Sequence, residues 1–136
     1  PLKTLKLFVH SYQSFLFNKI SNEFLKIHRG YNKIKNIKIP IIGFDFEAGY
    51  INDNKLKNII KKTINEEKIS PRDFIISQMP ELTSEGNFRD LFFELKGLKI
   101  LEISEDELNQ DKKKAKINFT LPKSCYATTA IEFIFQ

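Results

Sequence analysis

The stretch that begins Ile117-Asn118-Phe119-Thr120-Leu121-Pro122 and continues Lys123-Ser124-Cys125-Tyr126-Ala127-Thr128 changes its pattern twice. Before the proline, apolar and polar residues alternate, as in a strand with one buried face. Pro122 ends that strand, small residues follow, and a helix is predicted from about Thr128 to Phe135. Tyr126 therefore lies in a turn at a helix start, where its ring can form a flat, rigid contact surface beside a pocket.

Helical spacing of apolar residues, together with capping signals, predicts three earlier helices. The longest runs from Leu5 to about Ile27. Asn52 or Asp53 can cap a second helix, whose lysines face outward. A third, short helix follows Ser70, with proline at its first position and an acid at its third, and ends near Met79-Pro80. The positions predicted to face the core from the longest helix are Leu5, Phe8, Tyr12, Phe15, Leu16, Ile20, Phe24 and Ile27.

Extended segments lie between and after these helices. Residues 31–39 predict a connector or an edge strand, which Pro40 ends. Residues 88–94 and 98–103 predict strands joined near Gly97, and the acidic residues 104–111 predict a loop. Neither an internal repeat nor a low-complexity linker is visible. The sequence therefore predicts the α+β class, with helices packed on a small mixed or antiparallel sheet in a single compact unit.

Length and composition are those of an ordinary globular domain. The 136 residues include thirteen phenylalanines, which supply enough apolar area for a core. A membrane span needs about 18 uncharged apolar residues in a row, and no stretch of the sequence is that long. No signal-peptide pattern occurs either. The single cysteine excludes an internal disulfide and a cysteine-based zinc site, and fits a reducing cytoplasm. A net charge of +5 permits an anionic partner such as RNA.

Residues 119–128 resemble the phenylalanine-x-leucine-proline-lysine-glycine-serine-tyrosine-alanine-threonine signature of the TruD family of tRNA pseudouridine synthases. His10–Asn18 is similar to that family's histidine-alanine-tyrosine-glutamine-serine-tyrosine-leucine-phenylalanine-asparagine helix, and Pro40–Phe44 to its proline-leucine-proline-glycine-tyrosine loop. A further segment resembles the family between these and the signature, in the same order. Its matching residues are Asp73, Phe74, Pro80, Glu81, Leu82, Gly86 and Arg89.

The resemblance implies that the intact enzyme isomerises a uridine of tRNA to pseudouridine. The base is flipped from its stack, an aspartate attacks, and the uracil rotates and rejoins through carbon. The resemblance implies tRNA as the partner, and neither a metal nor an organic cofactor. It also implies a dry pocket with aromatic walls, within which the freed base turns.

The family's glycine-x-lysine-aspartate motif, which carries the nucleophilic aspartate, has no match in this chain. The chain also begins at Pro1 and not at methionine. We therefore expect this chain to be the C-terminal portion of the enzyme, without its N-terminal catalytic part. Such a portion has no catalytic residue and is expected to be inactive by itself. Residues 1–112 are expected to form the family's insertion domain, and residues 113–136 the returning strand and helix of the catalytic domain. A stand-alone RNA-binding module and a generic interaction domain are the alternatives.

The signature suggests a substrate-binding turn made of Lys123, Tyr126, Ala127 and Thr128. The resemblance places Tyr126 against the target base, and Lys123 is suited to meet a phosphate near the helix start. The alternatives are a half-buried tyrosine that only packs the helix and a solvated lysine. Three positions depart from the family, which has glycine, serine and arginine where this chain has Ser124, Cys125 and Glu132.

Basic residues elsewhere have spacing suited to phosphate contacts or to a solvated face. These RNA-binding candidates are Arg29, Lys33, Lys35, Lys38 and Arg89. For Arg89 the favoured role is a structural pairing with a nearby acid. Gln13 and Ser14 are expected either to brace the neighbouring loop or to lie on the surface. His10 and His28 lack the spacing of metal ligands and are expected at the helix surface or its cap.

Overall fold

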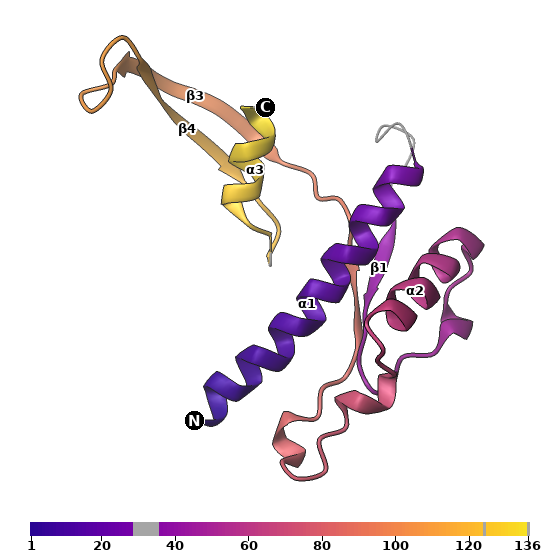
Figure 1. Ribbon diagram of the computed structural model, residues 1–136. Helices are drawn as coiled ribbons and strands as arrows, with labels where there is room; N and C mark the ends of the chain where they lie inside the picture. Colours follow the sequence, from indigo (N-terminus) through magenta and orange to yellow (C-terminus); the bar gives the residue numbers. More distant parts are fainter. Residues whose placement is uncertain (29–35, 124, 136) are drawn as a thin grey trace. The chain divides into compact units, whose positions relative to one another are not determined.

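The computed structural model describes residues 1–28, 36–123 and 125–135 (Figure 1). It confirms the α+β class, with helices and two small antiparallel sheets. The chain divides into two compact units, Pro1–Leu91 and Phe92–Gln136, where the sequence predicted one.

The first unit is built on α1 (Leu2–Ile27), a 26-residue helix that confirms the predicted long helix. Its buried face differs in part from the predicted one. Leu5, Phe8, Phe15 and Ile27 are exposed, whereas Phe17, which was not predicted inward, is buried. His28 ends the helix, and its ring stacks on Phe24 with 4.2 Å between the ring centroids. The buried side chains of α1 are Gln13, Leu16, Phe17, Ile20, Ser21 and Phe24.

Two short strands, β1 (Lys38–Ile41) and β2 (Asn87–Asp90), pair antiparallel beside α1. The register places Ile39 opposite Arg89 and Pro40 opposite Phe88. Pro40 thus lies inside β1, whereas the sequence predicted that it ends the strand. Proline is tolerated here because a two-stranded sheet has only edge strands. The predicted strand 88–94 therefore ends at Asp90, and its partner is β1, not the strand that follows it in sequence.

Helix α2 (Asn54–Glu66) packs on α1 and completes the first core. Asp53 caps it, because its Oδ1 accepts a hydrogen bond from the backbone N–H of Leu56 at 2.9 Å. This confirms one of the two predicted caps. The side chains that α2 buries are Leu56, Ile59, Ile60 and Thr63.

Three single turns of 3₁₀ helix complete the first unit: η2 (Ala48–Tyr50), η3 (Pro71–Phe74) and η4 (Pro80–Leu82). The predicted capping box at Ser70 is present, but the helix it starts ends at Phe74, earlier than expected. Ile75 is already extended, and the N–H of Ser84 donates to the carbonyl of Phe74 at 3.1 Å. The returning chain thus takes the carbonyl that a longer helix would have used.

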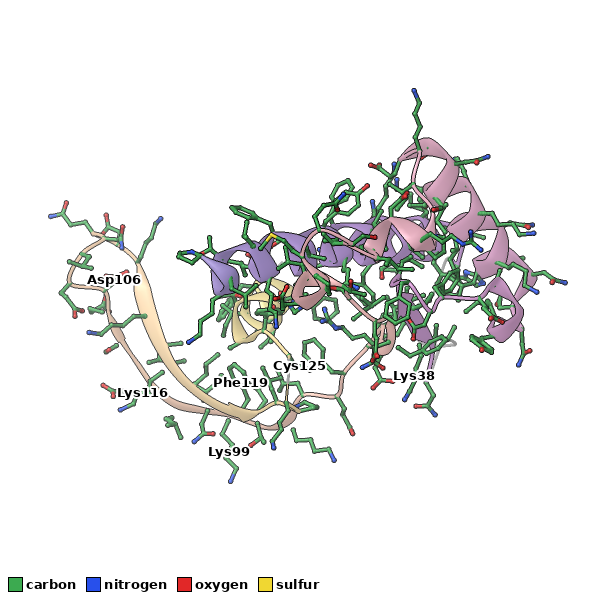
Figure 2. The ribbon with its side chains drawn as sticks, turned by 90° about the horizontal axis from the view of Figure 1, so that it is seen from below. Lys38, Lys99, Asp106, Lys116, Phe119 and Cys125 are labelled. Atoms are coloured by element: carbon green, nitrogen blue, oxygen red, sulfur yellow. The ribbon has the colours of Figure 1, made fainter. Side chains whose placement is uncertain are left out.

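The second unit is a ribbon of two antiparallel strands, β3 (Lys96–Glu105) and β4 (Lys113–Thr120), followed by α3 (Ala127–Ile134). This confirms the alternating strand and the final helix. Gly97 adopts a positive φ of 63° inside β3, and so does not join two strands. The second unit's only buried apolar side chain among the described residues is Ala130. Figure 2 shows Lys99 and Lys116 extending outward from the ribbon.

Candidate nucleic-acid interface

The turn between β4 and α3 places Tyr126 immediately before the helix, as the sequence predicts. The backbone N–H of Cys125 donates to the carbonyl of Pro122 at 3.4 Å and closes the turn. Tyr126 is the N-cap residue in an extended conformation, and its carbonyl accepts from the N–H of Ala130 at 3.3 Å. Two backbone hydrogen bonds therefore hold the main chain around Tyr126 in place.

The ring of Tyr126 is open to contact. The residue is 69% exposed, so in this chain it does not serve as a half-buried packing residue. Lys123, Ala127 and Thr128 are also exposed. All four predicted substrate-binding residues thus lie at the surface of one short segment.

The start of α3 can attract an anion. The first N–H groups of a helix have no partner within the helix, and the helix dipole makes this end positive. The side chain of the N-cap residue Tyr126 makes no capping hydrogen bond. Lys123 forms no ion pair with any residue that the structure describes. The segment therefore offers a cation, free N–H groups and an aromatic ring together.

The basic candidates of the first unit have different surroundings. Lys38 is exposed at the start of β1. Arg89 is half-buried, and its guanidinium carbon lies 5.1 Å from the centroid of the Phe17 ring. The structural pairing expected for Arg89 is therefore with an aromatic ring, and no ion pair with an acid occurs among the described residues. Arg29, Lys33 and Lys35 lie outside the described residues.

The lysines at the start of β4 are partly neutralised. Lys114 forms an ion pair with Glu107 across the hairpin, and the hydrogen bond from Lys114 lowers the pKa of the Glu107 carboxyl. Asp106 also has a lowered pKa, mainly because the side-chain amide of Asn109 donates to it. These contacts organise the hairpin turn and leave Lys112 and Lys113 as its unpaired cations among the described residues.

Gln13 is the residue whose importance the sequence left open. Its side chain is only 5% exposed, and its Nε2 donates to the carbonyl of Ile42 at 2.9 Å and to that of Glu85 at 3.0 Å. It thus braces the loop, one of the two expected roles. The glutamine joins α1 to two segments that are distant in sequence. The signal available beforehand was the helical spacing of Gln13, which lies three residues before Leu16 and seven before Ile20, both predicted to face the core.

Further contacts tie the same segments together. The N–H of Phe44 donates to the carbonyl of Ser84 at 3.1 Å, and the N–H of Gly86 donates to Asp45 Oδ1 at 2.6 Å. Three of the four stretches with family resemblance therefore meet inside the first unit. Their shared role there is to fix the β1–β2 ribbon on α1.

The described parts of the chain also bear on two other kinds of site. No group of three or more His, Cys, Asp or Glu side chains there is arranged to hold a metal ion. No helix within them has the length and apolar character needed to cross a membrane.

Comparison with known proteins identifies the family. The model of the family described as tRNA pseudouridine synthase D (TruD) matches residues 21–132. Proteins named probable tRNA pseudouridine synthase D are 30% identical in Methanopyrus kandleri and 31% identical in Nanoarchaeum equitans, over 96% and 99% of this chain. A TruD crystal structure from Methanosarcina mazei is 26% identical and superposes on 97% of this chain with a TM-score of 0.73.

The chain belongs to the tRNA pseudouridine synthase D family. It spans only about a third of those relatives' length, since it covers 32% of the Methanopyrus kandleri protein and 34% of the Nanoarchaeum equitans protein. In the Methanosarcina mazei structure the matching part is 38% of the chain.

Proposed function

We propose that this chain supplies tRNA-binding surface and part of the uracil pocket of a tRNA pseudouridine synthase. The exposed ring of Tyr126, held at the start of α3 in a chain of this family, carries the proposal. The relatives named tRNA pseudouridine synthase D support the reaction. The reactive aspartate belongs to a part of the same protein outside this chain, because the chain has no glycine-x-lysine-aspartate motif.

The proposed reaction explains why an aromatic ring is useful at this position. A uridine that leaves its stack loses its stacking energy, and an aromatic side chain replaces that contact without reading the sequence. A flat wall also lets the uracil turn in its plane while it remains in contact. Tyr126 has this role in the proposal, with Ala127 and Thr128 beside it and Lys123 on a neighbouring phosphate.

The β3–β4 ribbon supports a docking role for the second unit. A ribbon of two strands is marginal in water and needs a further surface to cover it. Apolar side chains of β3, including Leu98, Ile100 and Ile103, are exposed in this chain. We propose that the catalytic part of the protein covers this unit. The expected division at residue 112 remains a prediction, and it would separate β4 from its hydrogen-bonded partner β3.

The first test uses the whole protein that contains this chain and compares Tyr126→Ala with Tyr126→Phe. Because the ring acts on the flipped base, the alanine variant should lower turnover more than it lowers tRNA affinity. The phenylalanine variant keeps the ring and should stay close to the parent. Equal turnover of the alanine variant and the parent would remove Tyr126 from the site.

The second test is a titration of the 136-residue chain with tRNA at several salt concentrations. Phosphate contacts predict an affinity that falls steeply as salt rises. Lys33→Glu with Lys35→Glu should weaken binding and reduce that dependence. Binding that does not change with salt would contradict an RNA-binding role. An upstream glycine-x-lysine-aspartate motif in the same reading frame would separate an enzyme portion from a stand-alone RNA-binding module.

A further inference from the structure

The first unit contains a hollow that the proposed uracil pocket does not use. It has a volume of about 210 Å³ and lies between the β1–β2 ribbon and the segment 45–50. Tyr50 and Phe88 supply aromatic walls, and Asp45 and Asn87 supply polar groups. Aromatic faces together with hydrogen-bonding groups are the features with which proteins bind unpaired bases of RNA.

Both aromatic side chains are exposed, and their main chains are held in place. Tyr50 is 64% exposed and Phe88 is 43% exposed. Phe88 stands in β2 opposite Pro40, and Tyr50 ends η2 directly before the buried Ile51. Their main chains are therefore held by a strand pair and by the core. Because the main chain is already held, stacking a base orders only the two rings and no loop.

The polar side chains of the hollow leave one hydrogen-bond acceptor and one hydrogen-bond donor free. Asp45 Oδ1 accepts the N–H of Gly86 at 2.6 Å, which holds the carboxylate, while Oδ2 makes no hydrogen bond with the described residues. Asn87 Oδ1 accepts the N–H of Phe88 at 2.7 Å, so its Nδ2 remains a donor. The hollow thus presents a carboxylate acceptor and an amide donor.

This pair of groups distinguishes guanine from adenine, and the second donor of guanine, N2–H, distinguishes it from uracil, which has only N3–H beside O4. Guanine carries two neighbouring donors, N1–H and N2–H, beside the acceptor O6, so a carboxylate and an amide donor complement it. Adenine has an unprotonated N1 that would face the carboxylate and repel it. We propose that the hollow is a subsite for an unpaired guanine of bound RNA. The inference rests on the proposed RNA-binding function and deepens it.

The test follows the ring signals of Tyr50 by NMR in the 136-residue chain with labelled tyrosines. The chain has only four tyrosines, and Tyr50→Phe identifies the relevant signal. The probes are the single-stranded pentamers UUGUU, UUAUU and UUIUU, where I is inosine, which lacks the N2 amino group. UUGUU should shift the Tyr50 signal and bind about tenfold more tightly than UUAUU. UUIUU should lie between them.

Three variants separate stacking from base reading. Asp45→Asn keeps an Oδ1 for the N–H of Gly86 but replaces the free acceptor with a donor, so the preference for guanine over adenine should disappear. Phe88→Leu should weaken the binding of every pentamer. Tyr50→Ala should do the same, and because it lacks the Tyr50 signal its binding is followed by the fluorescence anisotropy of end-labelled pentamers. Phe8→Leu removes an exposed ring from α1, outside the hollow, and serves as the matched control with unchanged binding. Circular dichroism and thermal unfolding show that each variant is folded.

The outcomes divide cleanly between the two proposals. If tRNA binds in a salt-dependent way while no pentamer shifts Tyr50, the guanine subsite is wrong and the proposed function stands. A guanine preference that survives in Asp45→Asn also overturns the subsite. If the parent chain binds neither tRNA nor any pentamer, the RNA-binding function fails and the subsite fails with it.

Discussion

A Cβ atom on Gly43 would lie 2.0 Å from the backbone nitrogen of Gly86. Non-bonded atoms do not come so close, so the two main chains touch where any other residue would hold them apart. Gly43 does not have a positive φ, and the close approach alone requires glycine there. The contact brings the segment after β1 against the segment before β2, beside the carbonyls of Ile42 and Glu85, which accept the hydrogen bonds of Gln13.

Gly43→Ala should destabilise the first unit severely, because the added methyl group meets backbone atoms that cannot move aside. Overpacking usually costs about 1–3 kcal/mol, and a contact with main chain belongs at or above the upper end. Gly49→Ala is the matched control, since its Cβ would meet no atom within 4 Å. Urea unfolding of both variants measures the difference, and similar midpoints would show that the two segments separate easily.

Gln13→Leu should lower the free energy of unfolding by about 1–3 kcal/mol, because it removes the donor for two carbonyls in a place where water has little access. Asn18→Leu makes the same kind of change at an exposed position of α1 and should have little effect. Chemical denaturation of the two variants checks the prediction. A Gln13→Leu variant as stable as the parent would mean that water replaces the amide.

Relations between residues close in sequence were predicted well. The Asp53 cap and the Ser70 capping box are present because each depends on groups within three residues of it. The place of Tyr126 before α3 followed from Pro122 and from the apolar period. Sequence patterns report such local relations directly.

Relations between distant residues were not predicted. Helical periodicity shows where α1 is apolar but not which part of that face is covered, and so Phe8 and Phe15 are exposed while Phe17 is buried. The partner of β2 is β1, which is far away in sequence, and the residues of neither strand predict which strand it pairs with. The same limit explains why Phe17 was missed as the partner of Arg89.

Arg89→Gln and Phe17→Leu should show an energetic coupling of about 0.5–1 kcal/mol, or more if the pair is shielded from water, because the guanidinium lies 5.1 Å from the ring centroid. A double-mutant cycle measured by denaturation gives this energy. The same variants titrated with tRNA test the RNA-binding role predicted for Arg89. No coupling, with weaker tRNA binding only for Arg89→Gln, would assign Arg89 to RNA.

Lys19 of α1 links the end of α2 to α1 through charge. Its Nζ lies 3.0 Å from Glu66 Oε2 and 2.8 Å from Glu67 Oε1. The hydrogen bond from Lys19 lowers the pKa of Glu66 below its ordinary value of 4.5. A carboxyl whose folded pKa is depressed stabilises the fold above its unfolded pKa, and this contribution is lost as the pH falls through the folded pKa.

Lys19→Met should therefore reduce stability at neutral pH, and the difference from the parent should shrink as the pH falls below the ordinary value of 4.5 for Glu66. Lys6→Met removes an exposed lysine of α1 that forms no ion pair with the described residues, so its difference from the parent should change little over that range. Denaturation at a series of pH values measures both.

At high pH the contribution of Lys19 to stability depends on pH in the opposite direction, because it is lost as the pH rises. Because its hydrogen bond to Glu67 raises the pKa of Lys19 above 10.5, the contribution of Lys19 is retained until the pH rises through that raised value. A difference between Lys19→Met and the parent that stays constant into acid would show that the helix pair gains nothing from this charge.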